Sequence, residues 1–378
     1  MNTLGIGFVG AGWMGAAQLK VLARRTDVQV HALLEPNAER GRALLTELGL
    51  DPALLVSDYQ QILDHPRVQA VWLVSPNSYH GPQSLAAMAA GKHLFCEKPC
   101  ATRYADYLAQ IVLERQHPAL ITYVDYILYF DTLEQQLRRM VSQGIFGEIT
   151  QIQVNYRHPV NIAGDKAWKL KKDLMGDAIG MGINHALSAM ILAMASQAKP
   201  VSVFASSQEA KVRGFEADPI WNILIRFDNG ATGLCLGNID NGNGYDAYHS
   251  LYGTAGGFVF DSQLDRPQKV RYWSTGQAEE QWVYPLDAAR CQQQGLQELA
   301  WPPGATTPDS GDVIQHQLGA CIEHFLECVH HGQRSPLGFT NSAVIAEVGW
   351  AAQVSAKTGQ PVALPLAVDH AKRVLQEP

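Results

Sequence analysis

Short apolar runs alternate with amphipathic segments through the first third of the chain. The predicted strands cover residues 4–12, 28–35, 70–76, 93–99 and 118–126, and the predicted helices cover residues 16–25, 39–49 and 83–92. Strands that alternate with helices favour a parallel sheet with helices on both faces. In such sheets ligands bind beyond the carboxyl ends of the strands, so we expect binding groups where each apolar run stops.

After about residue 124 the pattern changes to an alternation of apolar and polar positions, which is typical of antiparallel strands. Residues 221–238 alternate on both sides of Asp228-Asn229-Gly230, a strong hairpin signal. We therefore expect an α/β domain over residues 1–123 and an α+β domain with an antiparallel sheet over residues 124–378. The Pro- and Gly-rich stretch 299–312 predicts a surface loop before the final helices.

The first apolar run ends in a glycine-rich turn that opens a helix. Gly10, Gly12 and Gly15 have the GxGxxG spacing of dinucleotide-binding loops. The first glycine permits a tight turn, the second lets the backbone approach a pyrophosphate, and the third lets helix and strand pack closely. The helix N-terminus adds partial positive charge. We predict that a dinucleotide binds along the loop Gly10-Ala11-Gly12-Trp13-Met14-Gly15.

The next predicted strand ends at Glu35, whose carboxylate can accept hydrogen bonds from the adenosine ribose hydroxyls. The same carboxylate would repel a 2′-phosphate, and the neighbouring Pro36 and Asn37 supply no cation to receive one. Arg40 lies about one helical turn further along the chain. We therefore expect NAD rather than NADP as the cofactor.

Composition narrows the class of partner. The 378 residues are 47% hydrophobic and 17% charged with a net charge of -7, and they contain no basic run, so we expect no nucleic-acid partner. No apolar run approaches the roughly 20 residues that span a bilayer, so we expect no membrane partner. The N-terminus shows no basic-then-apolar leader pattern, and six cysteines favour reduced thiols over a disulfide scaffold. These features predict a cytoplasmic protein with a small-molecule ligand.

One helical face near the C-terminus carries Cys321, His324, Cys328 and His331 at steps of three and four residues. These are side chains that zinc accepts as ligands. Because apolar residues interleave with them and cysteine is often buried, we interpret the segment as an amphipathic helix and predict no metal site. We also interpret Cys96 and Cys100 as free thiols.

Several stretches resemble, in order and spacing, the Gfo/Idh/MocA oxidoreductases. They are "GFVGAGWMG", "LLEPNAER", "VSPNSYH", "AAGKHLFCEKP", "GIFGEITQIQ", "FDNGATG" and "LYGTAGGFVFD". The resemblance covers nearly the whole chain and implies a Rossmann NAD-binding domain followed by an α+β domain with a large, mostly antiparallel open sheet. It also implies a homodimer or homotetramer formed through that sheet, and a sugar or polyol as substrate.

The resemblance implies roles for the charged end of the strand in "HLFCEKPCAT". Lys98 matches the family lysine that lies beside the nicotinamide and reaches the substrate hydroxyl, where an ammonium would stabilise a developing alkoxide. Glu97 would hold the lysine or the cofactor in place. Pro76, Asn77 and His80 match the stretch that passes the nicotinamide and its ribose. His80 could equally be a helix-start residue whose ring is satisfied by backbone groups.

The proton acceptor matches the family pattern less well. Family dehydrogenases commonly carry Asp-x-x-x-His in the second domain, and with His185 as the base, Met181 stands at the position of the acid. A register shifted by one makes Asn184 the match for the histidine and Gly180 the match for the acid, so neither register keeps the carboxylate. The family arginine in the stretch before "SQGIFGEI" is Tyr129 here.

His185 still has suitable chemistry, because an imidazole with a pKa of about 6.5 can take a hydroxyl proton at neutral pH. We therefore predict His185 as the catalytic base beside Lys98. Further polar and aromatic residues expected in a sugar pocket are Tyr126, His158, Lys166, Trp168, Lys169 and Asn184.

Together these features predict an NAD-dependent dehydrogenase or reductase that acts on a secondary alcohol of a sugar, sugar derivative or cyclitol. Two alternatives stay open because the acid beside His185 is missing. The first is a redox-neutral enzyme that keeps NAD bound and uses transient oxidation to assist elimination or glycoside hydrolysis. The second is a dinucleotide-binding sensor without catalytic activity.

Overall fold

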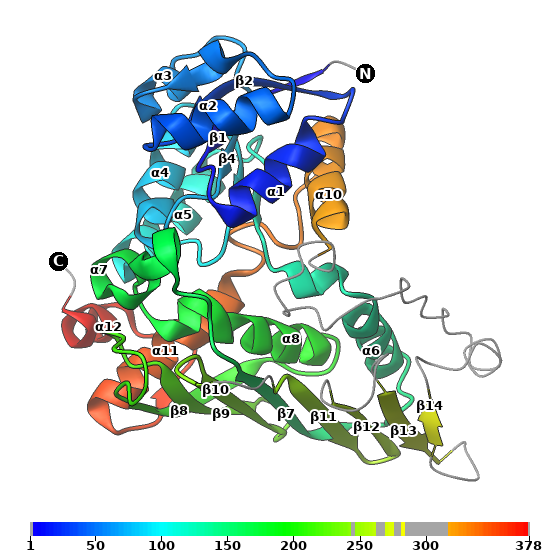
Figure 1. Ribbon diagram of the computed structural model, residues 1–378. Coiled ribbons are helices and arrows are strands. Elements are labelled where there is room, and N and C mark those ends of the chain that lie inside the picture. Colours follow the sequence, from blue (N-terminus) through cyan, green and yellow to red (C-terminus); the bar gives the residue numbers. More distant parts are fainter. Residues whose placement is uncertain (1–2, 243–245, 262–268, 276–280, 284–316, 377–378) are drawn as a thin grey trace. The chain divides into compact units, whose positions relative to one another are not determined.

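This computed structural model describes residues 3–242, 246–261, 269–275, 281–283 and 317–376. The chain divides into two compact units, and most of their helices and strands are labelled in Figure 1. The first unit comprises Met1–Tyr126, Asp173–Gly176 and Leu318–Ala343, and the second comprises Ile127–Lys172, Asp177–Gln317 and Val344–Pro378. The surface loop predicted at 299–312 lies outside the described residues. No helix in the described ranges is long and apolar enough to cross a membrane.

A six-stranded parallel sheet forms the centre of the first unit, with the strand order β3-β2-β1-β4-β5-β6. Its strands are β1 (Leu4–Val9), β2 (Val28–Leu34), β3 (Leu55–Val56), β4 (Ala70–Leu73), β5 (His93–Cys96) and β6 (Thr122–Val124). Strand order reverses at β1, so right-handed crossovers before and after it place their helices on opposite faces of the sheet. This arrangement confirms the doubly wound sheet that the apolar alternation predicts.

The helices of the first unit follow the strands in the expected order. They are α1 (Trp13–Leu22), α2 (Ala38–Glu47), the short helices η1 (Pro52–Leu54) and α3 (Tyr59–Leu63), then α4 (Asn77–Ala89), α5 (Tyr104–Gln116) and α10 (Leu318–His331), while α7 (Lys172–Met175) crosses the limit between the units. Helix α4 begins at Asn77, six residues before the apolar spacing indicated, because Pro76 caps it and the short polar first turn hides its periodicity.

Helix α10 packs in the first unit although the sequence pattern assigned all residues after 124 to the second domain. Its apolar stripe packs into the core of this unit through Phe325, which is fully buried. The Phe325 ring meets Trp72 edge-on at 5.3 Å and Phe95 at 5.7 Å between ring centroids. Trp72 and Phe95 themselves stack at 3.9 Å. A distant helix therefore completes the first core, and Tyr126 also belongs to this unit.

The second unit is built on a nine-stranded sheet with the order β14-β13-β12-β11-β7-β10-β9-β8-β15. Its strands are β7 (Ile149–Arg157), β8 (Pro200–Gln208), β9 (Ile220–Phe227), β10 (Thr232–Asn238), β11 (Tyr248–Gly253), β12 (Gly256–Asp261), β13 (Lys269–Ser274), β14 (Gln281–Val283) and β15 (Val362–Ala363). All neighbouring pairs are antiparallel except β7 with β10. The predicted hairpin joins β9 and β10, and Gly230 turns the chain with a φ of 88°.

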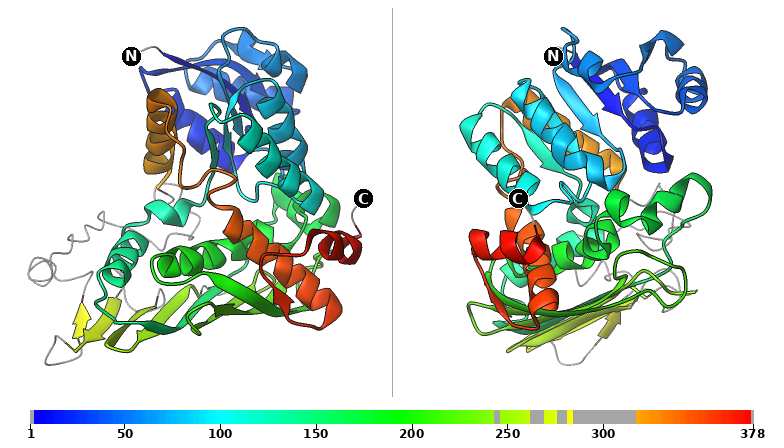
Figure 2. Two further views of the ribbon diagram at one scale, coloured as in Figure 1. Left: turned by 180° about the vertical axis from the view of Figure 1, so that it is seen from behind. Right: turned by 90° about the vertical axis from the view of Figure 1, so that its left-hand side faces the viewer.

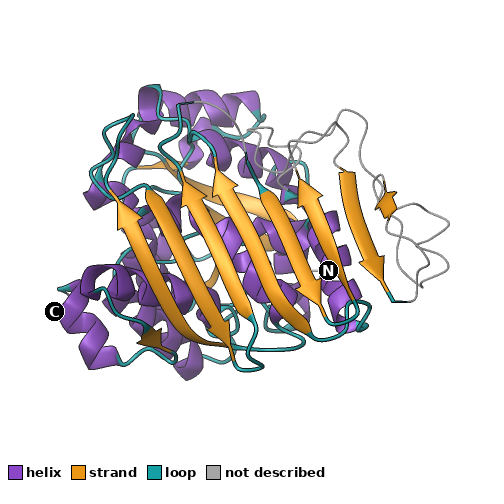
Figure 3. Ribbon diagram, turned by 90° about the horizontal axis from the view of Figure 1, so that it is seen from below, coloured by secondary structure: helices purple, strands orange, loops and turns teal. Residues whose placement is uncertain are grey.

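Helices cover one face of this sheet and leave the other open, as Figure 3 shows. They are α6 (Thr132–Ser142), α8 (Asn184–Met194), α11 (Ala343–Thr358) and α12 (Val368–Leu375), with the shorter segments η2 (Ile127–Phe130), η3 (Gly164–Leu170) and the π-helical η4 (Ile179–Ile183). Figure 2 shows α8 lying along the sheet, and it contacts β7 and β10. The large, mostly antiparallel open sheet expected from the sequence is confirmed.

Replacing Phe325 with alanine should cost about 3–5 kcal/mol of unfolding free energy, because it removes a fully buried ring that three aromatic neighbours enclose. Urea denaturation followed by tryptophan fluorescence measures the loss. Glu327→Ala, an exposed change on the same helix, is the control and should stay within about 0.5 kcal/mol of the unaltered protein. A small effect of Phe325→Ala would show that α10 is not part of this core.

Candidate active site

The turn between β1 and α1 is shaped by two glycines. Gly10 has a φ of 97°, and a Cβ there would lie 2.5 Å from the Val74 carbonyl oxygen. At Gly15 a Cβ would lie 2.1 Å from the Gly10 carbonyl oxygen, so the helix can approach the strand only without a side chain. Gly12 differs, because a Cβ there would meet nothing within 4 Å. The two outer glycines are thus required by the turn itself, and open space lies beside the central one.

These features fit a dinucleotide. Gly12 stands at the N-cap of α1 and offers no side chain to cap the helix. The amides of the first turn therefore face the open space, and they form the positive end of the helix dipole. Trp13 is 42% exposed and Met14 is half-buried at the same helix start. An anionic pyrophosphate is the kind of group that such a terminus accepts.

Glu35 follows β2 and is held by three donors. Its Oε2 accepts from the Ala11 backbone N at 2.8 Å, and its Oε1 accepts from the Asn37 backbone N at 2.9 Å. Arg40 reaches back from α2 and places Nη2 2.7 Å from the same Oε1. Sequence spacing placed Arg40 only a turn away, whereas the structure pairs it with Glu35. The carboxylate is therefore fixed between the glycine turn and a cation.

After β4, both ring nitrogens of His80 lie within hydrogen-bonding distance of backbone carbonyl oxygens. Its Nδ1 is 2.7 Å from the Pro99 oxygen and its Nε2 is 2.7 Å from the Ser75 oxygen. Burial lowers the pKa of His80, and its effect exceeds that of the two carbonyls, which raise it. Asn77, also buried, donates from Nδ2 to the Met175 oxygen at 2.9 Å. Both residues connect loops of the first unit, and their contact with a cofactor stays a prediction.

Two buried acids lie at the ends of neighbouring strands, Glu97 after β5 and Asp125 after β6. Gln18 donates from Nε2 to Glu97 Oε1 at 2.8 Å and to Asp125 Oδ2 at 3.2 Å, and the two acids hydrogen-bond to each other. Trp72 Nε1 donates to Gln18 Oε1 at 2.7 Å, which fixes the amide with its NH₂ toward the acids. Asp125 is fully buried and Glu97 is 8% exposed. We call Gln18, Glu97 and Asp125 the acid cluster.

Burial and mutual repulsion disfavour the simultaneous ionisation of both acids in the cluster. Burial, followed by the charge of Glu97, raises the pKa of Asp125 well above its usual range. Burial also raises the pKa of Glu97, but the adjacent Lys98 ammonium opposes that shift. The proton therefore lies on Asp125, which donates it to Glu97. An ionised Glu97 stands directly before Lys98, and its Oε2 accepts from the Lys98 backbone N at 3.2 Å.

The predicted substrate residues are divided between the units. Lys98 is half-buried in the first unit, where Tyr126 is only 3% exposed and burial raises the pKa of its hydroxyl. Trp168 is half-buried in η3 of the second unit. Asn184 and His185 begin α8 and are each 6% exposed. Lys98 and Tyr126 therefore belong to the first unit, and the other three residues belong to the second.

The structure brings His185 together with an aromatic residue that the sequence reasoning missed. Tyr156 on β7 lies 5.7 Å from the His185 ring and 4.6 Å from the ring of His158, between centroids. Gly182 lets this tyrosine approach, because a Cβ there would be 2.6 Å from the Tyr156 ring. Met181 stands one helical turn before His185, as the sequence indicated. No local pattern marks Tyr156, since it is one more buried position of an alternating strand.

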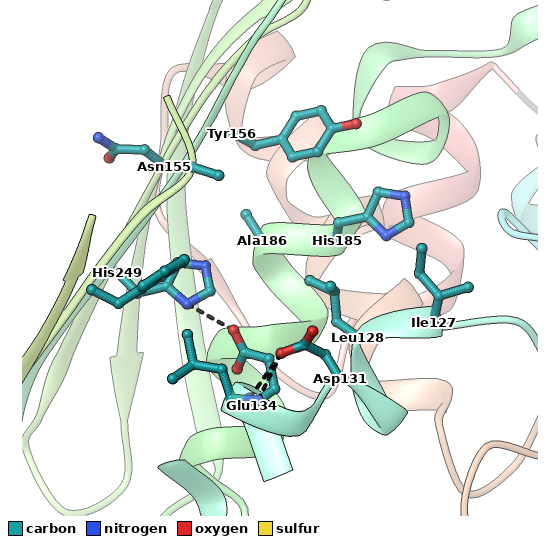
Figure 4. Close-up of a pocket in the computed structure, with 12 residues that line it drawn as sticks. Ile127, Leu128, Asp131, Glu134, Asn155, Tyr156, His185, Ala186 and His249 are labelled. Carbon is teal, nitrogen blue, oxygen red and sulfur yellow. Dashed lines mark hydrogen bonds and ion pairs between the residues drawn. The ribbon is translucent and has the colours of Figure 1, made fainter. Parts of the chain in front are cut away.

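A cavity within the second unit holds further groups that sequence reasoning missed. Figure 4 shows His185 and Tyr156 at one end and Asp131, Glu134 and His249 at the other. Glu134 Oε1 lies 2.8 Å from His249 Nδ1. Asp131 has a recognisable sequence signal, because Asp before "TLEQQL" is an N-cap. Glu134 stands three residues after this N-cap, as in a capping box, but nothing in the sequence indicates its pairing with the distant His249.

In α10, His324 Nε2 lies 3.5 Å from Cys328 Sγ, so two members of the predicted face contact each other, and the remaining contacts are with other groups. His324 Nε2 lies 2.9 Å from Ser335 Oγ, and His331 Nδ1 lies 2.8 Å from the Glu327 oxygen. Cys321 contacts Asp125 and Tyr123 through its thiol. The five described cysteines, including Cys96 and Cys100, are free thiols.

Both halves of the chain match known family sequences. Residues 4–125 match the family described as "Oxidoreductase family, NAD-binding Rossmann fold", and residues 135–259 match the "GFO/IDH/MocA C-terminal domain". The solved levoglucosan dehydrogenase in complex with NADH and levoglucosan shares the fold with a TM-score of 0.78. It is 21% identical, over 96% of this chain and 100% of that chain.

Two curated relatives match a shorter part of the sequence. Inositol 2-dehydrogenase from Gluconacetobacter diazotrophicus is 30% identical over 157 residues, which are 41% of this chain and 46% of that protein. The 1,5-anhydro-D-fructose reductase from Ensifer adhaerens is 27% identical over 178 residues, 47% of this chain and 52% of that protein. The chain thus spans about half the length of these relatives.

The acid cluster predicts a specific dependence of stability on pH. An acid whose pKa is raised by folding binds a proton that the unfolded chain releases, so stability falls as pH rises from the unfolded pKa of about 4 toward the folded pKa. Asp125→Asn removes this loss while its amide still donates to Glu97. The variant should match the unaltered protein near pH 4 and exceed it above, by about 1.4 kcal/mol per pH unit until the folded pKa is reached.

Urea denaturation at several pH values measures this difference. Glu39→Gln, which changes an exposed acid on α2, should leave the pH dependence unaltered. An Asp125→Asn protein that is less stable at neutral pH would show that Asp125 is needed as a carboxylate, against the arrangement described here.

Proposed function

The chain belongs to the Gfo/Idh/MocA oxidoreductase family, and on this premise we propose that it is an NAD-dependent dehydrogenase or reductase acting on a secondary alcohol of a sugar, sugar derivative or cyclitol. The observation that carries the proposal is Lys98 at the carboxyl end of β5, next to the buried acid cluster. The carboxyl ends of parallel strands are where ligands of such sheets bind. The named relatives act on or bind small carbohydrates and cyclitols, which supports this substrate class.

The glycine turn, Glu35 and the loops after β4 and β5 would hold the cofactor. The residues proposed for this role are Gly10, Ala11, Gly12, Trp13, Met14, Gly15, Glu35, Pro76, Asn77, His80, Glu97 and Lys98. The chemistry that bound NAD⁺ supplies is acceptance of the hydride that leaves the alcohol carbon. The same groups serve the reverse direction, in which a ketone is reduced.

Lys98 and His185 divide the remaining work. The Lys98 ammonium stabilises negative charge on the reacting oxygen, and ionised Glu97 beside it keeps that ammonium protonated and in place. His185 takes the proton of the hydroxyl group. Its ring packs against Tyr156, which restricts the imidazole where the helical acid of related dehydrogenases is absent. We propose that Tyr156 orients the His185 ring. It does not neutralise the positive charge of the imidazolium, so other groups must do so.

Substrate hydroxyls away from the reacting carbon would meet Tyr126, Trp168 and Asn184. The clearest support is for Asn184, because its Oδ1 is buried and finds no donor within the described part of the chain. A buried amide oxygen of this kind gains from a hydroxyl donor. Trp168 offers an aromatic face of the type that packs against sugar C–H groups.

We also propose a homodimer or homotetramer formed through the open face of the large sheet. Phe204 on β8, Leu224 on β9 and Tyr252 on β11 are 44%, 40% and 37% exposed there. Exposed apolar groups on several strands of one sheet face are typical of an interface, and a second copy of the same face is its simplest partner.

The cofactor preference is a first test. We predict at least about tenfold tighter binding of NAD(H) than of NADP(H), because Glu35 repels a 2′-phosphate and holds Arg40 in an ion pair. Glu35→Gln should reduce that ratio, since it removes the repulsion and releases Arg40 toward the phosphate. Calorimetry at matched ionic strength measures both, with Glu39→Gln as the control. Equal or tighter binding of NADP by the unaltered protein would contradict the prediction.

The role of Lys98 is the second test. Lys98→Met keeps most of the apolar stem and deletes the charge, so turnover should fall roughly a hundredfold or more while melting temperature and NAD affinity change far less. Lys92→Met is a matched control, because Lys92 lies before the opposite end of β5 and binds the Val68 carbonyl. Retained turnover in Lys98→Met would show that this lysine is only a charged strand end.

The assay itself separates the candidate functions. NADH that accumulates with one of a panel of sugars and cyclitols supports the dehydrogenase. Product without net NADH supports the redox-neutral enzyme, and binding without turnover supports the sensor. His185→Ala distinguishes the proposed base from structural residues, because it should lower turnover far more than NAD affinity.

A further inference from the structure

The cavity beside His185 encloses about 510 Å³ of empty space, its open mouth included. Its walls are largely apolar and include Leu128, Leu133 and Phe260. At the end away from Tyr156 the lining changes to carboxylates, which Figure 4 shows as Asp131 and Glu134 next to His249.

One carboxylate oxygen at this cavity is buried without a donor in the described part of the chain. Asp131 Oδ1 caps α6 by accepting from the Leu133 and Glu134 amides at 3.0 and 3.1 Å, and its Oδ2 takes no part in this cap. Glu134 Oε1 is bound to His249, but its Oε2 is buried without a partner among the described residues. Each of the two acids is only 3% exposed. Buried carboxylate oxygens are costly unless a donor reaches them.

Among the described residues, the cations near these acids compensate them only in part. Arg138 on the same helix donates from Nη2 to the Tyr129 carbonyl and lies over the Tyr129 ring at 4.6 Å, and it does not line the cavity. His249 engages one oxygen of Glu134. Burial and the charge of Glu134 raise the pKa of Asp131 to about 6, although His249 opposes the shift. The carboxylate end of the cavity therefore favours an additional positive charge.

We propose that this cavity binds a protonated amino group of the substrate, so that the preferred substrates are amino sugars or aminocyclitols. The inference rests on the dehydrogenase proposed above and specifies its substrate. The ammonium donates to Asp131 Oδ2 and Glu134 Oε2, and the apolar walls pack against ring C–H groups. His185 lines the same cavity, which places the amino group on a carbon other than the one that is oxidised.

Matched pairs of substrates test the inference. Each pair consists of a cyclitol or sugar and its analogue with one hydroxyl replaced by an amino group, and kcat/KM is measured for both. The amino compound should be preferred about tenfold or more, as one charge-assisted hydrogen bond allows. The preference should disappear in Glu134→Gln and fall in Asp131→Asn, while Glu209→Gln, an exposed change on the same unit, should leave it intact.

Asp131→Asn is the second variant because asparagine caps helices as well as aspartate does, so it folds even where Glu134→Gln does not. The preference should also decrease below about pH 6, where Asp131 is protonated. An equal kcat/KM for both members of every pair, or a preference that survives both variants, would overturn the inference.

Binding measurements keep this inference separate from the proposed reaction. If no polyol or amino polyol is oxidised, the dehydrogenase proposal fails, and calorimetry with the same pairs still examines the cavity. Tighter binding of the amino compound that is lost in Glu134→Gln supports the cavity site. Absence of any such difference contradicts it.

Discussion

The first unit depends on one interaction, the sharing of a proton between Glu97 and Asp125 beneath Gln18. Two ionised carboxylates could not be buried together there, because each would lack compensation in a low-dielectric interior. One proton resolves the conflict and leaves a single negative charge, which the neighbouring Lys98 ammonium attracts toward Glu97. The position and charge of the proposed catalytic lysine therefore follow from a hydrogen-bond arrangement located behind it.

The acid cluster also connects helices and strands that are far apart in the sequence. Trp72 from β4 orients the Gln18 amide, so a helix after the glycine turn and the central strands are connected through polar atoms inside an apolar core. Cys321 brings α10 to the same point, next to the aromatic packing around Phe325. A buried polar network is stable only when nearly every member is satisfied, and here five separated segments contribute. The result is a fixed strand end at the place where chemistry is proposed.

Sequence reasoning reached the local features and missed the long-range pairs. The glycine turn, Glu35 and the Asn229-Gly230 hairpin could be predicted because backbone conformation and short spacing specify them. Glu97 was recognised as an anchor, but its partner Asp125 was not, because strand ends that are neighbours in a sheet carry no mark of that pairing in the chain. The docking of α10 was missed for the same reason. An amphipathic stripe indicates that one face of a helix is buried, but it does not indicate which sheet that face packs against.

The second unit shows the complementary situation, in which polar groups are left partly unsatisfied. Asn184 Oδ1 and Glu134 Oε2 are buried acceptors without donors in the described ranges, on two helices that cover the same face of the sheet. A core built only for stability would pair or replace them, because each such atom costs about 1–3 kcal/mol. The first unit balances its buried acids internally, whereas the second keeps acceptors that a hydroxyl or ammonium could satisfy. That difference between the buried acids of the two units supports the proposal that the second unit selects the substrate.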